Sequence, residues 1–163
     1  AGRNARMSPI GRHAAAPAPA PATPTPPFLW PCRVYWEDTD AGGVVYHARY
    51  LHFLERARTE WLRALGHGQQ HLRERDGVLF VVHRMELAFN APARLDDALL
   101  ASVEVVERRS ASFSVRQTLR RQGEAVILLD AQVRIACLDA ARFRPCPIPT
   151  HLIEEIVQPC PTT

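Results

Sequence analysis

The chain has 163 residues and a formal net charge of +3, a length that suits one domain with a real core, alone or with a tail. The arginines of residues 1–27 account for that charge, because this segment holds no acid and the other 17 basic residues balance the 17 acidic ones. The rest of the chain is therefore formally neutral, which argues against a nucleic-acid-binding protein. No apolar run approaches the roughly 20 residues that span a bilayer, so no integral membrane segment is expected.

Composition divides the chain into a tail and a domain. Residues 13–27 are almost entirely alanine and proline, which cannot build a core, so we expect residues 1–27 to be a disordered tail. The domain should occupy 28–157, with a short C-terminal tail at 158–163. The four cysteines include no CxxC pair and no clustered histidine. We therefore expect reduced thiols in a cytoplasmic protein rather than a zinc site or a disulfide framework.

The first half of the domain reads as a strand followed by a long helix. We expect a strand over 32–38 (CRVYWED) and then the glycine-containing loop TDAGG. From about Tyr46 to Leu65, apolar residues recur at three- and four-residue steps, which predicts an amphipathic helix of about five turns. Gly66 follows the last periodic residue and suits a left-handed C-terminal cap. A short helical piece is expected at 69–75.

The second half reads as four strands and a short helix. The strands are expected at 77–90, 97–108, 112–121 and 125–139, with a hairpin turn at Gln122-Gly123. Thr150 can cap a final helix over 151–157. Strands around one long helix predict an α+β domain with a five-stranded antiparallel sheet. Because that single apolar helix must be covered, the sheet should wrap around it as the central helix of a hotdog fold.

The stretch EDTDAGG (37–43) places acids and adjacent glycines just before the long helix. The first N–H groups of a helix lack intrahelical acceptors and carry partial positive charge, so they can polarise a carbonyl. Gly42 and Gly43 allow close approach of backbone to a ligand. The pattern predicts an acyl-transfer site in which Asp40 acts either as nucleophile or as general base.

Simpler interpretations of the same residues remain open. Asp38 or Asp40 can make an Asx-turn or a cap without any catalytic role. Glu37, Asp38, Asp40 and His47 include hard metal ligands, but acids along a strand point to alternating faces, which disfavours a metal site. The chain has no GxSxG elbow, no GxxxxGK[ST] loop, no HExxH and no GxGxxG fingerprint.

The segment RVYWEDTDAGGVVYHARYLHFLERAR (33–58) resembles the signature of the 4-hydroxybenzoyl-CoA thioesterase family. It is most similar to the YbgC branch, the acyl-CoA thioesterases associated with the Tol-Pal envelope system, as is FVVHRMELAFNAPARLDD (80–97). The resemblance covers about residues 30–157. It implies a hotdog fold, active sites formed between two subunits, and no metal or other cofactor. It places Asp40 at the catalytic aspartate and the backbone N–H of His47 where the thioester carbonyl is bound.

The function expected from this resemblance is hydrolysis of an acyl-CoA, or of an acyl carrier protein thioester, to a free acid and a thiol. A thiol has a pKa of about 8.5, so a thiolate leaves without a strong general acid. The alternative is a non-catalytic module that binds acyl thioesters or acyl carrier protein in envelope or lipid metabolism. A hotdog dehydratase would need a histidine with a helix carboxylate, and we find no matching arrangement.

Further residues are assigned to the substrate. Gly43, Val45, Tyr46 and Tyr50 are candidates for the acyl pocket, although Tyr50 also fits the apolar stripe of the helix. Glu55 is a second candidate for a catalytic carboxylate, with a surface ion-pair role as its simpler interpretation. Arginine can bind a phosphate group of CoA through two parallel hydrogen bonds. Polar residues in turns and strands can make such contacts, although charged residues also occur in turns simply because turns face solvent. The candidates for CoA binding are His83, Arg84, Arg108, Arg109, Ser110 and Ser112.

A closed hotdog subunit would leave an unpaired edge strand and an exposed helix flank. Pairing two subunits edge to edge would make a continuous sheet and cover both. We therefore expect a homodimer or a homotetramer.

Overall fold

The computed structural model describes residues 26–157. Its elements in chain order are β1 (Phe28–Arg33), the 3-10 turn η1 (Trp36–Asp38), α1 (Arg49–Ala64), α2 (Gln69–Arg75), β2 (Val78–Phe89), β3 (Ala98–Arg108), β4 (Ser112–Arg121), β5 (Ile127–Asp139) and α3 (Thr150–Val157). The predicted tails fall outside the described residues, apart from residues 26 and 27, and so does Cys160.

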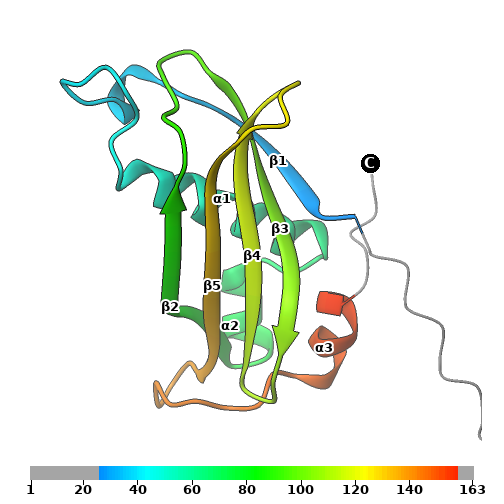
Figure 1. The fold of residues 1–163 in the computed structure, drawn as a ribbon. Coiled ribbons are helices and arrows are strands. Elements are labelled where there is room, and N and C mark those ends of the chain that lie inside the picture. Colours follow the sequence, from blue (N-terminus) through cyan, green and yellow to red (C-terminus); the bar gives the residue numbers. More distant parts are fainter. Residues whose placement is uncertain (1–25, 158–163) are drawn as a thin grey trace, which may run out of the picture.

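The strands form a single five-stranded sheet in the order β1-β3-β4-β5-β2, and every neighbouring pair is antiparallel (Figure 1). The α+β class and the five-stranded antiparallel sheet predicted from the sequence are thus confirmed. β1 and β2 form the two edges of the sheet. A bulge interrupts β2 between Val82 and Arg84, so the strict alternation of side chains expected there is broken at His83.

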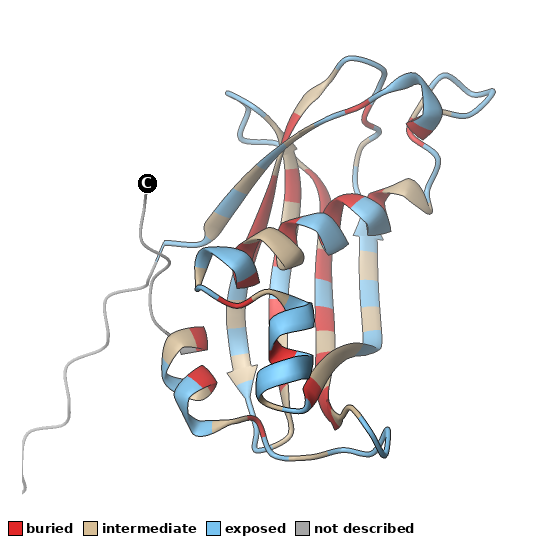
Figure 2. Ribbon diagram, turned by 180° about the vertical axis from the view of Figure 1, so that it is seen from behind, coloured by how far each residue is buried: buried red, intermediate tan, exposed pale blue. Residues whose placement is uncertain are grey.

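Helix α1 lies across one face of the sheet, and Figure 2 shows buried residues at intervals along its ribbon. The apolar stripe read from the sequence is the stripe that is buried: Tyr50, Phe53, Leu54, Ala57, Trp61 and Leu62. The opposite flank of the helix is exposed and includes Leu51, His52, Glu55 and Arg56. This packing of one long helix on a curved antiparallel sheet is the hotdog arrangement.

The strand predicted over 32–38 is wrong in its bounds. β1 ends at Arg33, which pairs with Ala98 of β3, and residues 36–38 form a 3-10 turn instead. The cause is a local hydrogen bond that competes with the sheet, in which Tyr35 N donates to Asp38 Oδ2 at 2.9 Å. Tyr35 and Trp36 therefore leave the sheet and are exposed. The long helix also begins later than predicted, at Arg49 rather than near Tyr46.

The chain after α1 follows the predicted order closely. Gly66 has a φ of 89°, the left-handed conformation expected of a helix C-terminal cap. The C-terminal helix α3 is docked by Leu152 and Ile156, both buried, and by a contact between His67 Nε2 and the Glu155 carboxylate. Among residues 26–157, no helix is both long and apolar enough to cross a membrane.

Candidate functional site

The loop that carries Asp40 is a tight hairpin. Asp40 N donates to Val44 O and Gly43 N donates to Asp40 O, both at 3.0 Å. Thr39 and Val45 form an antiparallel bridge that closes the loop. Gly43 has a φ of 73°, a conformation that residues with a Cβ rarely adopt. The adjacent glycines read from the sequence therefore serve the turn itself.

Only one of the two carboxylate oxygens of Asp40 accepts a hydrogen bond within residues 26–157. Oδ1 accepts a hydrogen bond from Gly42 N at 2.8 Å, which is the Asx-turn considered from the sequence. Oδ2 has no hydrogen-bond partner within residues 26–157, and the residue is exposed. The turn and a catalytic role do not exclude each other, because one oxygen fixes the side chain while the other stays free for a reacting group.

The chain enters α1 through a turn that leaves N–H groups free. Arg49 N donates to Tyr46 O at 2.8 Å, and Leu51 N donates to Ala48 O at 3.2 Å. The N–H groups of His47 and Ala48 have no acceptor among the residues that the structure describes. His47 is exposed, so its N–H is open to a ligand. This is the arrangement that polarises a carbonyl at a helix start.

Asp38 connects the strand end to the helix start. The residue is 2% exposed, and it is the only buried carboxylate within residues 26–157. Oδ2 accepts from Tyr35 N, and Oδ1 lies 3.8 Å from Arg49 Nε. The backbone oxygen of Asp38 accepts from Tyr46 N at 2.9 Å. The sequence marked Asp38 only as a turn or metal candidate, and its bracing role depends on contacts that no local pattern reveals.

Arg49 completes this brace from the helix side. Its Nη2 donates to Glu37 O at 3.0 Å, and the same guanidinium lies beside the Asp38 carboxylate. The 3-10 turn and the first residue of α1 are therefore held together by these contacts. Within residues 26–157 no three His, Cys, Asp or Glu side chains converge as metal ligands would, so the geometry does not support a metal site.

The residues assigned to the acyl pocket separate into two groups. Val45 and Tyr50 are buried, at 3% and 4% exposure, and the Tyr50 hydroxyl accepts from Ala93 N at 2.9 Å. Their side chains belong to the core beneath the hairpin. Tyr46 is exposed, and its ring lies 4.4 Å from that of His47. Tyr46 and Gly43 thus remain on the surface, and Gly43 N donates to Asp40 O.

The candidate CoA contacts lie away from Asp40 in the single chain. Arg108, Arg109, Ser110 and Ser112 surround the β3–β4 turn, at the end of the sheet near α3, whereas the Asp40 hairpin is at the opposite end (Figure 1). Arg109 pairs with Glu107 at 2.8 Å. One subunit therefore does not bring this turn together with the candidate catalytic residues.

The remaining CoA candidates lie on the edge strand β2. His83 and Arg84 are both exposed beside the bulge. Arg84 pairs with Glu86 at 2.7 Å, so its charge is already balanced by a neighbour on the same strand.

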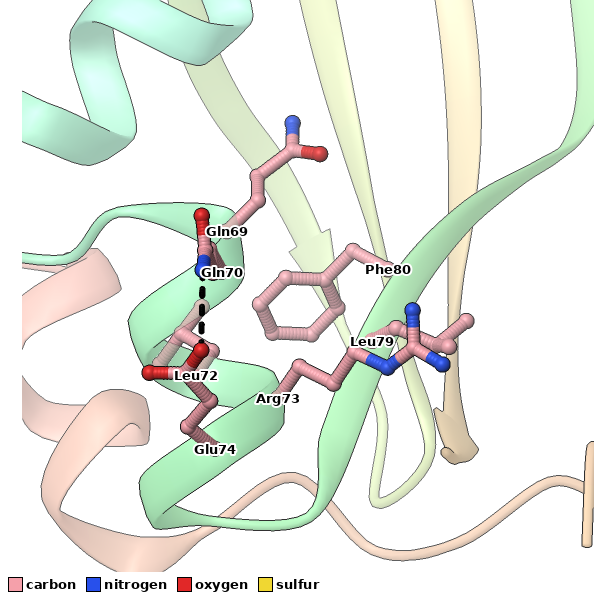
Figure 3. A pocket seen from close by; sticks show the side chains of 7 residues that line it. All are labelled: Gln69, Gln70, Leu72, Arg73, Glu74, Leu79 and Phe80. Carbon is pink, nitrogen blue, oxygen red and sulfur yellow. Dashed lines mark hydrogen bonds between the residues drawn. The ribbon is translucent and has the colours of Figure 1, made fainter. Parts of the chain in front are cut away.

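Two hollows lie along the flank formed by α1, α2 and β2. One, of about 640 Å³, is lined by Gln69 and Arg73 of α2 and by Leu79 and Phe80 of β2 (Figure 3). The other, of about 150 Å³, lies between α1 and β2, with Phe80 lining it as well. Neither hollow includes Asp40 or His47.

The smaller hollow contains polar residues that the sequence did not single out. Arg58 lines it and donates from Nη1 to Gln117 Oε1 at 2.8 Å. Gln117 is fully buried, and its amide nitrogen donates to Leu54 O and Ser102 O. Burial lowers the pKa of the Arg58 guanidinium, and the negative charge of Glu55 offsets part of this decrease. Glu55, the second carboxylate candidate, also lines this hollow and accepts from Thr59 Oγ1.

Comparison with known proteins identifies the family. Residues 34–156 match the model of the thioesterase-like superfamily. The chain belongs to that superfamily. The resemblance of the hairpin and helix to YbgC proteins is also confirmed, because relatives with that name align over most of the chain.

The acyl-CoA thioesterase YbgC of Haemophilus influenzae is 48% identical over 125 residues, which cover 77% of this chain and 90% of that protein. The acyl-CoA thioester hydrolase YbgC of Escherichia coli O6:H1 is 44% identical over 131 residues, covering 80% and 96%. The crystal structure of Slr0204, a 1,4-dihydroxy-2-naphthoyl-CoA thioesterase from Synechocystis, superimposes with a TM-score of 0.74 at 24% identity, covering 80% of this chain and 96% of that one. This last likeness concerns the fold.

Proposed function

We propose that the protein is an acyl-CoA thioesterase that hydrolyses a thioester to a free carboxylic acid and CoA. The observation that carries the proposal is the geometry around Asp40. Within residues 26–157, one carboxylate oxygen of Asp40 accepts from Gly42 N and the other has no partner, and the next turn of the chain presents the N–H of His47, which has no acceptor among those residues. The YbgC relatives, at 44–48% identity, support the same reaction.

In this mechanism the thioester carbonyl oxygen accepts a hydrogen bond from His47 N–H at the start of α1. The partial positive charge there stabilises the oxyanion that forms when the carbonyl carbon is attacked. Asp40 either attacks that carbon itself, giving an anhydride that water opens, or removes a proton from the attacking water. The CoA thiolate leaves in both cases, and the reaction does not require the imidazole of His47.

The active unit is a homodimer or a homotetramer. The edge strand β2 and the outer flank of α1 carry exposed apolar side chains, among them Leu51, Val82 and Phe89. A second subunit covering this flank would close the hollows beside α1 and bring the remote CoA candidates of one chain toward the hairpin of the other. We place the enzyme in the cytoplasm, with a link to the Tol-Pal system such as the YbgC resemblance implies.

The test is thiol release from short, long and aromatic acyl-CoAs by the wild type and by Asp40→Asn. We expect turnover of at least one substrate and a loss of about a hundredfold or more in the variant, the scale of general-base or nucleophilic catalysis. The matched control is Asp139→Asn, because Asp139 makes a similar turn, through Ala141 N and Arg142 N, at the end of β5. Asp139→Asn should retain wild-type rates.

The competing function is a non-catalytic module that binds acyl-CoA or acylated carrier protein. It would be supported if the wild type bound acyl-CoA, by calorimetry, without releasing thiol from any acyl-CoA or acylated carrier protein. In that case Asp40 would be a turn residue only, and Asp40→Asn would bind acyl-CoA with the affinity of the wild type.

A further inference from the structure

Two cysteines lie face to face at the end of the sheet. Cys137, in β5, is fully buried, and Cys146, in the segment that returns along β5, is half-buried. Their Sγ atoms are 3.7 Å apart. Cys146 N donates to Cys137 O at 3.0 Å, and the neighbouring Leu138 and Pro145 form an antiparallel bridge. The two cysteines are therefore directly opposite each other on a short ladder.

This position is compatible with a disulfide. Opposite residues on antiparallel strands have Cα atoms about 4.5–5.5 Å apart, within the range of about 4.4–6.8 Å that disulfides span. The sulfurs need to approach by less than about 2 Å to reach bonding distance, which side-chain rotation can supply. Cys32, in contrast, has no thiol neighbour within residues 26–157.

We propose that Cys137 and Cys146 are a redox modification site, at which a small disulfide such as oxidised glutathione converts the two thiols into an intramolecular disulfide. The half-buried Cys146 reacts first: its thiolate attacks one glutathione sulfur and releases one glutathione thiol. Cys137 then attacks Cys146 Sγ and expels the second glutathione. The protein loses two protons and two electrons, and the oxidised glutathione is reduced to two thiols.

The environment of Cys137 limits the rate of this exchange. Burial, together with its contact with Cys146, raises the pKa of Cys137 to about 12, so its thiolate is scarce at neutral pH and the closing step is slow. The disulfide should therefore form over hours rather than seconds.

The bond would tie the C-terminal segment to the sheet. Cys146 is followed by Ile148 and by α3, whose Leu152 is fully buried. In Figure 1 this segment lies at the end of the sheet opposite the Asp40 hairpin. The modification would therefore restrain the docking of α3 rather than act on the proposed catalytic site.

The experiment uses the full chain, incubated with oxidised glutathione or with dithiothreitol, alkylated, and analysed by intact mass and peptide mapping. The variants are Cys146→Ser, which removes the pair, with Cys32→Ser and Cys160→Ser as controls. We expect the alkylated oxidised protein to carry two fewer alkyl groups than the alkylated reduced protein, a linked peptide joining positions 137 and 146, and a melting temperature roughly 5–10 °C above that of the reduced protein. Cys146→Ser should abolish both effects, while the two controls keep them.

Three outcomes would overturn the proposal. Cys146 could be recovered as a stable mixed disulfide with glutathione, both thiols could stay free in protein that circular dichroism shows to be folded, or the linked peptide could involve Cys160 instead. A Cys146→Ala variant distinguishes loss of the bond from an effect of the serine hydroxyl. None of these readouts depends on thioesterase activity, so the proposal stands or fails separately from the proposed function.

Discussion

Removing the buried carboxylate of Asp38 should destabilise the domain. Asp38→Ala leaves Tyr35 N without its acceptor and Arg49 without the carboxylate 3.8 Å away. Losing a buried charge-assisted hydrogen bond costs about 1.5–3 kcal/mol, so we expect the free energy of unfolding to fall by about 3 kcal/mol. Asp38→Asn keeps an oxygen for Tyr35 N and loses only the charge, for which we expect about 1–2 kcal/mol.

Changing Asp38 should also lower activity, because Asp38 is linked to the segments that carry the candidate nucleophile and the candidate oxyanion donor. The backbone of Asp38 accepts from Tyr46 N, next to His47, and Asp40 follows two residues later. A displacement of about 1 Å at reacting groups costs up to a hundredfold in rate. We expect Asp38→Asn to reduce kcat/KM by about 10- to 100-fold while the protein remains folded.

The stability assay is urea unfolding followed by circular dichroism, with linear extrapolation to water. The control is Glu37→Gln, because Glu37 is the adjacent acid and lies 4.0 Å from Arg49 but is largely exposed. Glu37→Gln should change stability by less than about 0.5 kcal/mol. If Asp38→Ala cost no more than Glu37→Gln, the assignment of Asp38 as a buried brace would be refuted.

Two further predictions concern the hairpin and acid stability. In Gly42→Ala the new Cβ would lie 3.0 Å from Asp40 Oδ1, so the carboxylate must shift. We expect kcat/KM to fall roughly tenfold while the melting temperature stays unchanged. Full activity of this variant would show that the contact with Gly42 does not position Asp40. Several carboxyls have pKa values held below their ordinary values, mainly by hydrogen bonds from arginine side chains or backbone N–H groups. The stability that these ionised carboxyls contribute is complete above about pH 5 and is lost as pH falls through their lowered folded-state pKa values. The midpoint of urea unfolding should therefore decrease below pH 5, and it should decrease less steeply in 1 M salt. A midpoint that does not change with pH would contradict this prediction. These carboxyls are Asp76, Glu107, Asp130 and Asp139.

Local patterns in the sequence determined most of the secondary structure. The apolar period of α1, the Gly66 cap and strands β3 to β5 could be read correctly because the same side chains that set the period are the ones that are buried. The adjacent glycines and the acid before the helix likewise marked the hairpin that holds Asp40. In each case the physical cause acts between residues close together in the chain.

Tertiary structure alone decided the rest. The end of β1 depends on a pairing between distant segments, because Arg33 is the last residue that pairs with β3, opposite Ala98. The sequence also could not show that Arg58 reaches Gln117, or that Cys137 faces Cys146. Such pairings arise when separate segments pack on one sheet, and composition and period carry no information about which side chains then meet.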